Sequence, residues 1–254
     1  MKTSRYSLLM FLLVIALLVL VQSCSVQPKI LRSDSTGMEF VLVQPGTFQM
    51  GSENSDREMP IHSVTISKPF YLGRYEVTQK QWRDVMGTNP SRYQGDNHPV
   101  DSVSWNDAQD FIRKLNEKEG TTKYRLPTEA EWEFAARGGT QSHGYMYAGS
   151  NNETDVAVSG ENAVNKSYPV GSKRPNELGI YDMSGNIYEW CSDWYGSYAD
   201  SAQKDPKGPT SGTMHVLRGG SFHFGHDCDV TVRFYYYPSS RSYVVGFRCV
   251  RGVD

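Results

Sequence analysis

Cysteine is scarce in this chain. Only four occur among 254 residues, too few for the disulfide-dense framework of a small secreted scaffold. Cys24 follows an apolar N-terminal run, and Cys191, Cys228 and Cys249 lie in the last third of the chain. In an oxidising compartment these last three permit one disulfide and leave one thiol over, and the sequence does not choose the pair.

Runs of basic residues are also missing, and the formal net charge is −2 at pH 7. A nucleic-acid-binding protein carries a basic patch as its electrostatic footprint, so nucleic acid is excluded as an expected partner. The apolar run Leu8–Val21 is too short for a comfortable membrane span. Lys2 and Arg5 precede this run and Ser23 follows it, which predicts a secretory signal over residues 1–23.

The end of the signal, Val21–Cys24, resembles a bacterial lipobox, in which the cysteine is acylated and becomes the mature N-terminus. The alternative is an ordinary cleaved signal with a chance cysteine at this position. With lipidation at Cys24, we expect a lipid-anchored protein of the cell envelope, on the bacterial outer membrane or the cell surface. Its only contact with the membrane would be the anchor. Residues 24–37 are predicted to form a polar tether, and residues 38–254 one domain with a substantial core.

Local patterns predict short strands first and short helices next. Residues 38–50 read as two strands around the Pro45-Gly46 turn. Three capping boxes mark helix starts, at Thr78 with Gln81, Ser104 with Asp107, and Thr128 with Glu131. After residue 140 the chain is rich in loop-forming residues, with a short strand over 215–218. Propensity alone therefore predicts an α+β protein.

Four phrases in the chain make a family signature. They are Arg125–Glu133 (RLPTEAEWE), Gly185–Trp190 (GNIYEW), Arg218–Ser221 (RGGS) and Gly246–Arg251 (GFRCVR). In this order they resemble the formylglycine-generating enzyme (sulfatase-modifying factor) family, and the resemblance runs from about Gly37 to Arg251. It implies a C-type-lectin-like fold with a few short helices, short antiparallel strands and little regular secondary structure.

The family's catalytic motif reads Gly-Gly-Ser-x-x-Cys, with a second cysteine five residues later, and its two thiolates hold Cu(I), a soft ion that selects sulfur ligands. Counted from Ser221, the two positions here are Phe224 and Asp229, and neither is a thiol. Cys228 lies one place before the second position. Copper is therefore not expected, and the resemblance predicts a scaffold without the family's oxidase chemistry. The alternative is a formylglycine-generating-type oxidase, or another oxidative enzyme acting on a protein or peptide, that uses Ser221 and Cys228.

A calcium loop of the family is matched over residues 181–189. By this resemblance the ligands would be the carboxylates of Asp182 and Glu189 and the carbonyl oxygens of Gly185 and Ile187. Hard oxygen ligands with a glycine at the tight turn are what Ca²⁺ requires. The alternative is a hydrogen-bonded turn that holds Trp190 in the core.

The segment Phe222–Val245 lacks lysine, glutamate, glutamine, methionine and tryptophan. These five types make up 48 of the 254 residues, so their joint absence from 24 positions has a chance on the order of one in a few hundred. Randomising the adenines of AAC codons yields every residue type in the segment but never those five. The segment thus resembles the variable region of diversity-generating retroelement target proteins, which lies at the C-terminus of the same lectin-like scaffold. The alternative is a divergent family loop.

Under either origin the segment suits recognition, because tyrosines offer large contact areas at low entropic cost and short polar side chains adapt their hydrogen bonds. We therefore predict a non-catalytic protein that binds a protein, peptide or glycan ligand through this segment. The predicted contact residues are Phe222, His223, Phe224, His226, Asp227, Asp229, Tyr235, Tyr236, Tyr237, Ser239, Arg241 and Tyr243.

Overall fold

A computed structural model describes residues 29–223, 225 and 227–253. The predicted signal, the lipidation site Cys24 and the predicted contact residues Phe224 and His226 lie outside the described residues. Within the described part of the chain, no helix is both long and apolar enough to cross a bilayer. Strand β1 (Ile30–Arg32) pairs with β2 (Glu39–Val43), so the folded domain includes residues that the sequence assigned to the tether.

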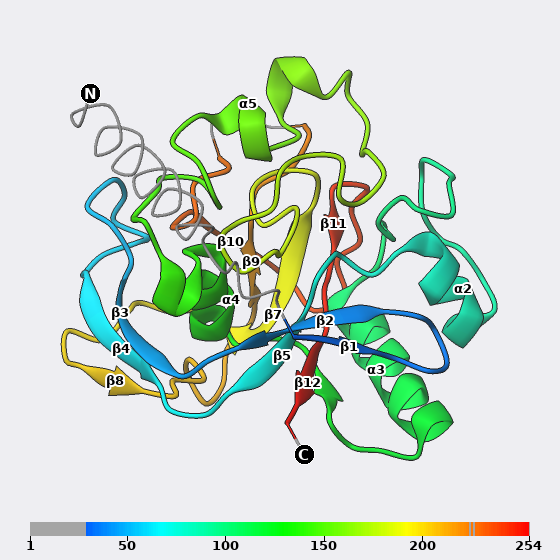
Figure 1. Ribbon diagram of the computed structural model, residues 1–254, viewed down its shortest axis with the longest axis horizontal. Helices are drawn as coiled ribbons and strands as arrows, with labels where there is room; N and C mark the ends of the chain where they lie inside the picture. The colour runs from blue at the N-terminus through cyan, green and yellow to red at the C-terminus, as the bar shows by residue number, and fades with distance from the viewer. Residues whose placement is uncertain (1–28, 224, 226, 254) are drawn as a thin grey trace, which may run out of the picture.

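The strands form three small sheets, and the fold is α+β as predicted. The first has the order β1-β2-β5-β12-β6, the second β10-β9-β7-β11, and the third β3-β4-β8. Figure 1 shows the third sheet on one side of the molecule and the helices α2 and α3 on the other. The remaining strands are β3 (Gly46–Met50), β4 (His62–Ile66), β5 (Phe70–Gly73), β6 (Tyr124–Arg125), β7 (Tyr188–Trp194), β8 (Gln203–Lys204), β9 (His215–Arg218), β10 (Arg233–Tyr236), β11 (Val245–Gly246) and β12 (Val250–Gly252).

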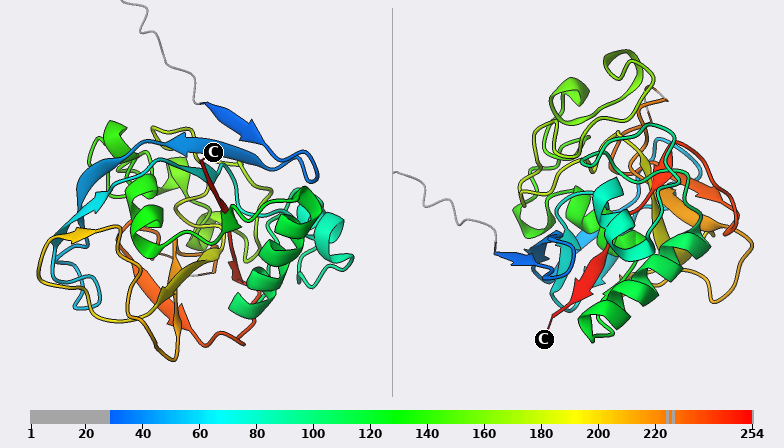
Figure 2. Two further views of the ribbon diagram at one scale, coloured as in Figure 1. Left: turned by 90° about the horizontal axis from the view of Figure 1, so that it is seen from below. Right: turned by 90° about the vertical axis from the view of Figure 1, so that its right-hand side faces the viewer.

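All three predicted capping boxes are present. The hydroxyls of Thr78, Ser104 and Thr128 each accept a hydrogen bond from the backbone N–H three residues later, at 3.3, 3.1 and 3.1 Å. The helices that follow are α2 (Gln79–Met86), α3 (Trp105–Glu119) and α4 (Glu129–Ala136). A short helix α5 (Glu153–Val156) lies in the loop-rich part, which the right-hand view of Figure 2 places at the end opposite the C-terminus.

The two strands expected over residues 38–50 exist, but they do not pair with each other. Strand β2 pairs with β1 and β5, whereas β3 pairs with β4 in another sheet. Gly46 lets the chain pass close to α4 at this point, because a Cβ there would lie 2.8 Å from the Phe134 ring. The chain therefore changes sheets at Pro45-Gly46 instead of folding back as a hairpin.

Helix α4 is the centre of the fold. All eight of its residues are buried, including Glu129, Glu131 and Glu133. A helix that is buried on every side must find partners for its charges, since an unpaired buried charge is strongly destabilising. Those partners are Arg233 of β10 for Glu129, Arg218 of β9 for Glu133 and Arg125 of β6 for Glu131.

Candidate functional site

The predicted contact segment is built partly on strand β10, which pairs antiparallel with β9 so that Tyr236 lies opposite His215. Side chains alternate between the two faces of a strand. Arg233 and Tyr235 contact Tyr195 on one face, whereas Phe234 and Tyr236 lie against Tyr188 and Trp190 on the other. The segment is divided by residue and not by strand face: Arg233 is buried and belongs to a scaffold half, whereas half-buried Phe234, Tyr235 and Tyr236 and exposed Tyr237 form a surface half.

Arg233 belongs to the scaffold half. It is only 4% exposed, and its guanidinium group donates to both oxygens of Glu129 on α4, at 2.6 and 2.8 Å. The ring of Tyr198 covers it at 3.8 Å. Two backbone carbonyls, of Arg57 and Gly196, accept its other hydrogen bonds. The sequence patterns did not indicate this pair between Glu129 and Arg233.

The surface half presents aromatic side chains. Phe234 lies 5.6 Å from Tyr188 and 5.5 Å from Tyr236, measured between ring centroids. Tyr235 packs on Tyr195 at 4.2 Å, and Tyr237 is 59% exposed. Rings held against one another lose little conformational freedom on binding a partner. This gives a preformed aromatic surface.

A stack of three rings continues this surface across the sheet. His215 lies between Trp105 and Trp194, with ring centroids 3.9 and 3.8 Å away. Burial lowers the pKa of His215, so the imidazole is neutral at pH 7, and its Nδ1 donates to the Asp193 carbonyl at 3.1 Å. Trp105 is half-buried. Nothing in the sequence around His215 indicated the stack, which joins helix α3 to strands β7 and β9.

The structure divides the predicted contact residues by exposure. Exposed are His223, Asp227, Tyr237, Ser239 and Arg241; half-buried are Asp229, Tyr235, Tyr236 and Tyr243.

The prediction for Phe222 is wrong, because its side chain is fully buried, within about 6 Å of the rings of Tyr93 and Tyr243. The guanidinium group of Arg241 donates two hydrogen bonds to the carboxylate oxygens of Asp107, at the start of α3, at 2.7 and 2.8 Å.

The two residues of the alternative, enzymatic prediction are inaccessible. Ser221 and Cys228 are both 0% exposed, and the Ser221 hydroxyl has no hydrogen-bonding partner. Burial raises the pKa of the Cys228 thiol well above its ordinary value, so it stays protonated and is a poor metal ligand or nucleophile. Cys191 and Cys249 are likewise buried, and these three thiols are free rather than paired in a disulfide.

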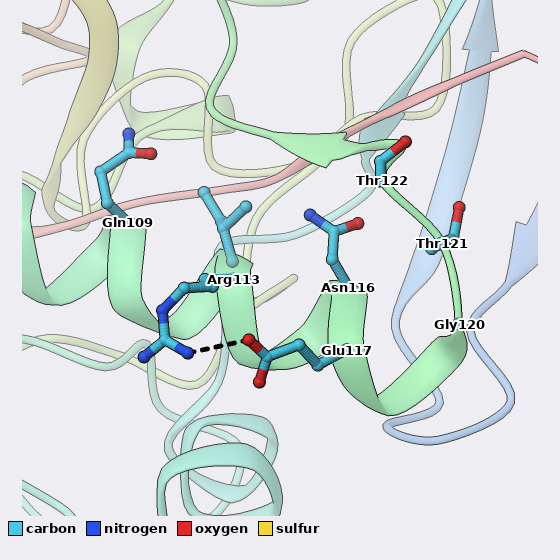
Figure 3. Close-up of a pocket in the computed structure, with 8 residues that line it drawn as sticks. Gln109, Arg113, Asn116, Glu117, Gly120, Thr121 and Thr122 are labelled. Atoms are coloured by element: carbon cyan, nitrogen blue, oxygen red, sulfur yellow. Dashed lines mark hydrogen bonds and ion pairs between the residues drawn. The ribbon is translucent and has the colours of Figure 1, made fainter.

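A shallow hollow lies on another part of the described surface. It has a volume of about 790 Å³ and follows α3 and the turn after it, from Gln109 to Thr122. Figure 3 shows its side chains, among which Arg113 pairs with Glu117 at 2.9 Å. Its wall offers polar groups from one helix and one turn, and none of the predicted contact residues. A substitution in this hollow is therefore a suitable control for ligand binding by the C-terminal segment.

Comparison with known proteins identifies the scaffold. A family model described as the sulfatase-modifying factor enzyme 1-like domain matches residues 27–253. The chain belongs to this family. The family resemblance read from the four sequence phrases is thereby confirmed.

Among curated relatives, "Chaperone protein LppX" of Paenibacillus barcinonensis is 37% identical over 84% of this chain and 87% of its own length. The formylglycine-generating enzyme of Streptomyces coelicolor is 38% identical over 70% of this chain and 60% of its own length.

Solved structures show the same scaffold. Treponema denticola variable protein 1 superposes with a TM-score of 0.81 at 32% identity, covering 89% of this chain and all of that one. PvdO from Pseudomonas aeruginosa gives a TM-score of 0.76 at 28% identity over 89% of this chain and 99% of that one. The predicted fold and the resemblance to a variable protein are both confirmed.

The two carboxylates of the calcium set suggested by the family resemblance, Asp182 and Glu189, already have hydrogen-bond donors. Both oxygens of Glu189 accept from Arg248, at 2.6 and 2.7 Å, and one also accepts from the Trp132 indole at 2.8 Å. One oxygen of Asp182 accepts from the Gly171 backbone at 2.7 Å. As folded here the set does not fit a cation, because an arginine already neutralises Glu189 at hydrogen-bonding distance.

Calcium at these residues stays an untested prediction of the resemblance, and the Arg248 contacts oppose it. We expect added Ca²⁺ to leave the melting temperature of chelator-treated protein unchanged, because only an ion that binds the folded state stabilises it. Thermal unfolding with and without millimolar Ca²⁺ measures this. A rise that disappears in Asp182→Ala would contradict the expectation and restore the site.

Proposed function

We propose that this protein is a non-catalytic, lipid-anchored protein of the cell envelope that binds a ligand through the exposed face of residues 223–243. The observation that supports it most is the division of that segment. Arg233 and Phe222 are buried and hold the segment in place, whereas half-buried Tyr235 and Tyr236 and exposed Tyr237 form an aromatic surface. A rigid scaffold that presents adaptable aromatic and short polar side chains is the physical design of a recognition surface. Similarity to a variable protein adds support.

The ligand class is a protein, peptide or glycan. The surface supplies rings for stacking, at Tyr236 and Tyr237, and hydrogen-bonding groups at His223, Asp227 and Ser239. Both kinds of contact serve peptides and sugars. A relative that is 37% identical is called a chaperone protein, and this name supports a protein ligand here.

Binding by the aromatic surface is testable with arrays of glycans and peptides. We expect Tyr236→Ala with Tyr237→Ala to weaken a bound ligand by about tenfold or more, since aromatic residues dominate interface energies. Arg113→Ala, on the exposed hollow of α3, is the matched control and should bind like the wild type. Equal binding by the tyrosine variant and the wild type would remove the aromatic surface from the function.

The alternative is an oxidase, and the buried thiol argues against it. Incubating the protein with Cu(I), oxygen and a peptide carrying Cys-x-Pro-x-Arg should yield no aldehyde by mass spectrometry, because Cys228 is protonated and inaccessible. Turnover in the wild type that is lost in Cys228→Ser would overturn this expectation and favour the enzyme.

Lipid anchoring rests on the lipobox-like sequence at Cys24. Metabolic labelling with a clickable fatty acid should mark the wild type and not Cys24→Ser. Label on both proteins, or on neither, would leave the protein without its proposed anchor.

Diversification by a retroelement is the finer part of the proposal. It requires a near-copy of the DNA for residues 218–251 close to the gene, differing only where the copy has adenine. Mismatches spread over all four bases, or no copy, would make the segment an ordinary divergent loop while leaving the binding test intact.

A further inference from the structure

A second cavity lies beneath the loop that follows β7, and Trp194, an outer ring of the stack around His215, lines it. Its volume is about 330 Å³, at the lower end of the range for small-ligand sites. Residues from the end of β3, the start of β4, the first turn of α4 and the loop 194–209 line it. It takes in Arg233, and otherwise none of its wall belongs to the C-terminal segment.

The wall combines apolar surface with deeply buried polar groups. Met50, Ala130 and Trp194 contribute apolar atoms, and Pro206 and Pro209 add more from the loop. Four polar side chains of the wall are each at most 5% exposed, namely His62, Glu129, Asp193 and Arg233. Mostly apolar walls with a few convergent polar groups are typical of binding sites for small groups.

Of the two buried acids in the cavity wall, Glu129 is paired with an arginine and Asp193 is not. Glu129 is neutralised by Arg233 and accepts a further hydrogen bond from the Tyr198 hydroxyl at 3.1 Å. Asp193 accepts from the Ser192 hydroxyl at 2.8 Å and from the Glu129 backbone at 3.1 Å. No ion pair within the described residues includes Asp193. A buried carboxyl without a cation is a position where a ligand's positive charge would be stabilised.

We propose that this cavity binds an alkylammonium group, such as the side chain of a lysine, with its charged end at Asp193 and its methylenes against the apolar wall. A cationic head on a hydrocarbon stem matches a cavity whose wall combines one unpaired acid with apolar side chains. The charge-assisted hydrogen bond to Asp193 provides selectivity over a neutral alcohol of equal length.

The protonation of Asp193 makes the proposal pH-dependent. Burial, and then the charge of Glu129, raises its pKa to about 7, with a smaller contribution from Glu131. The other charged or titratable groups of the cavity wall are His62 of β4, Arg233 of β10 and exposed Lys207 of the loop. An alkylammonium stays charged across this range, so its affinity should be about tenfold higher at pH 8 than at pH 6, where Asp193 is mostly protonated.

The experiment measures n-pentylamine binding to the whole chain by calorimetry or NMR titration, with 1-pentanol as the neutral probe. Asp193→Asn keeps an oxygen for Ser192 and Glu129 but carries no charge. We expect it to bind the amine about tenfold more weakly and without pH dependence, because hydrogen bonds to charged groups are worth about 1.5–3 kcal/mol. Lys207→Ala removes a like charge at the same cavity and should not weaken binding.

Three results would overturn the proposal. They are equal affinity for the amine and the alcohol, unchanged amine affinity in Asp193→Asn, and no detectable binding of the amine at pH 8. The pH dependence of the wild type provides a second measurement that needs no variant. The proposal stands or falls independently of the aromatic surface.

Discussion

Arg248→Met is expected to cost about 3–5 kcal/mol in the free energy of unfolding, because breaking a buried pair leaves its partner charge uncompensated. Arg248 is fully buried and donates hydrogen bonds to both carboxylate oxygens of Glu189 and to the carbonyls of Gly73 and Tyr181. The total free energy of unfolding of a native protein is roughly 5–15 kcal/mol, so the expected loss is a large fraction of the stability.

Two further carboxyls make the effect of Arg248→Met depend on pH. Burial and neighbouring acids raise the pKa of Asp182 to about 6, and they raise that of Glu76 well above its ordinary value. The folded-state pKa values of Asp182 and Glu76 lie above the unfolded-state values, so ionising these two carboxyls opposes folding. Protonating them at acidic pH removes that cost. The variant should therefore lose less stability at pH 5 than at pH 8.

Urea unfolding at both pH values measures this prediction. Arg32→Met is the matched control, because the Arg32 side chain is 70% exposed and its pair with Glu39 lies at the surface, where such pairs contribute little. Equal losses of stability in the two variants would contradict the buried pair of Arg248 and Glu189. A loss for Arg248→Met that is greater at low pH would contradict the roles given to Asp182 and Glu76.

Arg233→Ser and Tyr237→Ser are expected to differ by several kcal/mol although they lie four residues apart. Arg233→Ser leaves Glu129 buried without its cation, at about 3–5 kcal/mol, whereas the exposed Tyr237 should change stability by roughly 0.5 kcal/mol or less. Denaturant unfolding of both variants decides. Similar losses would show that the segment is not divided into scaffold and surface.

The local part of the fold could be predicted from sequence because its causes are local. A hydroxyl at Thr78, Ser104 or Thr128 caps a helix through atoms three residues away, and all three helices begin where the capping boxes predict. Strand partners depend on contacts far along the chain, so the separation of β2 and β3 into different sheets was not visible.

The composition of the binding segment was predicted from the sequence, but the burial of its individual residues was not, because burial also depends on contacts far along the chain. Tyrosine content indicated a recognition segment, but period-two alternation alone did not say which face of β10 is buried. A clue was available at α4, where three glutamates stand among alanine, tryptophan and phenylalanine in one short helix. Such a helix requires arginines, and Arg125, Arg218 and Arg233 supply them. The stack around His215 gave no sequence signal.

Exchange of the exposed positions alone tests the central claim most directly. His223, Asp227, Tyr237 and Ser239 would be replaced together by other residues that AAC-codon randomisation allows, with Phe222 and Arg233 kept, and the array profile and unfolding curve compared with the wild type. A recognition surface on a fixed scaffold predicts a changed ligand profile with stability within about 1 kcal/mol of the wild type. An unchanged ligand profile in a folded variant would contradict it.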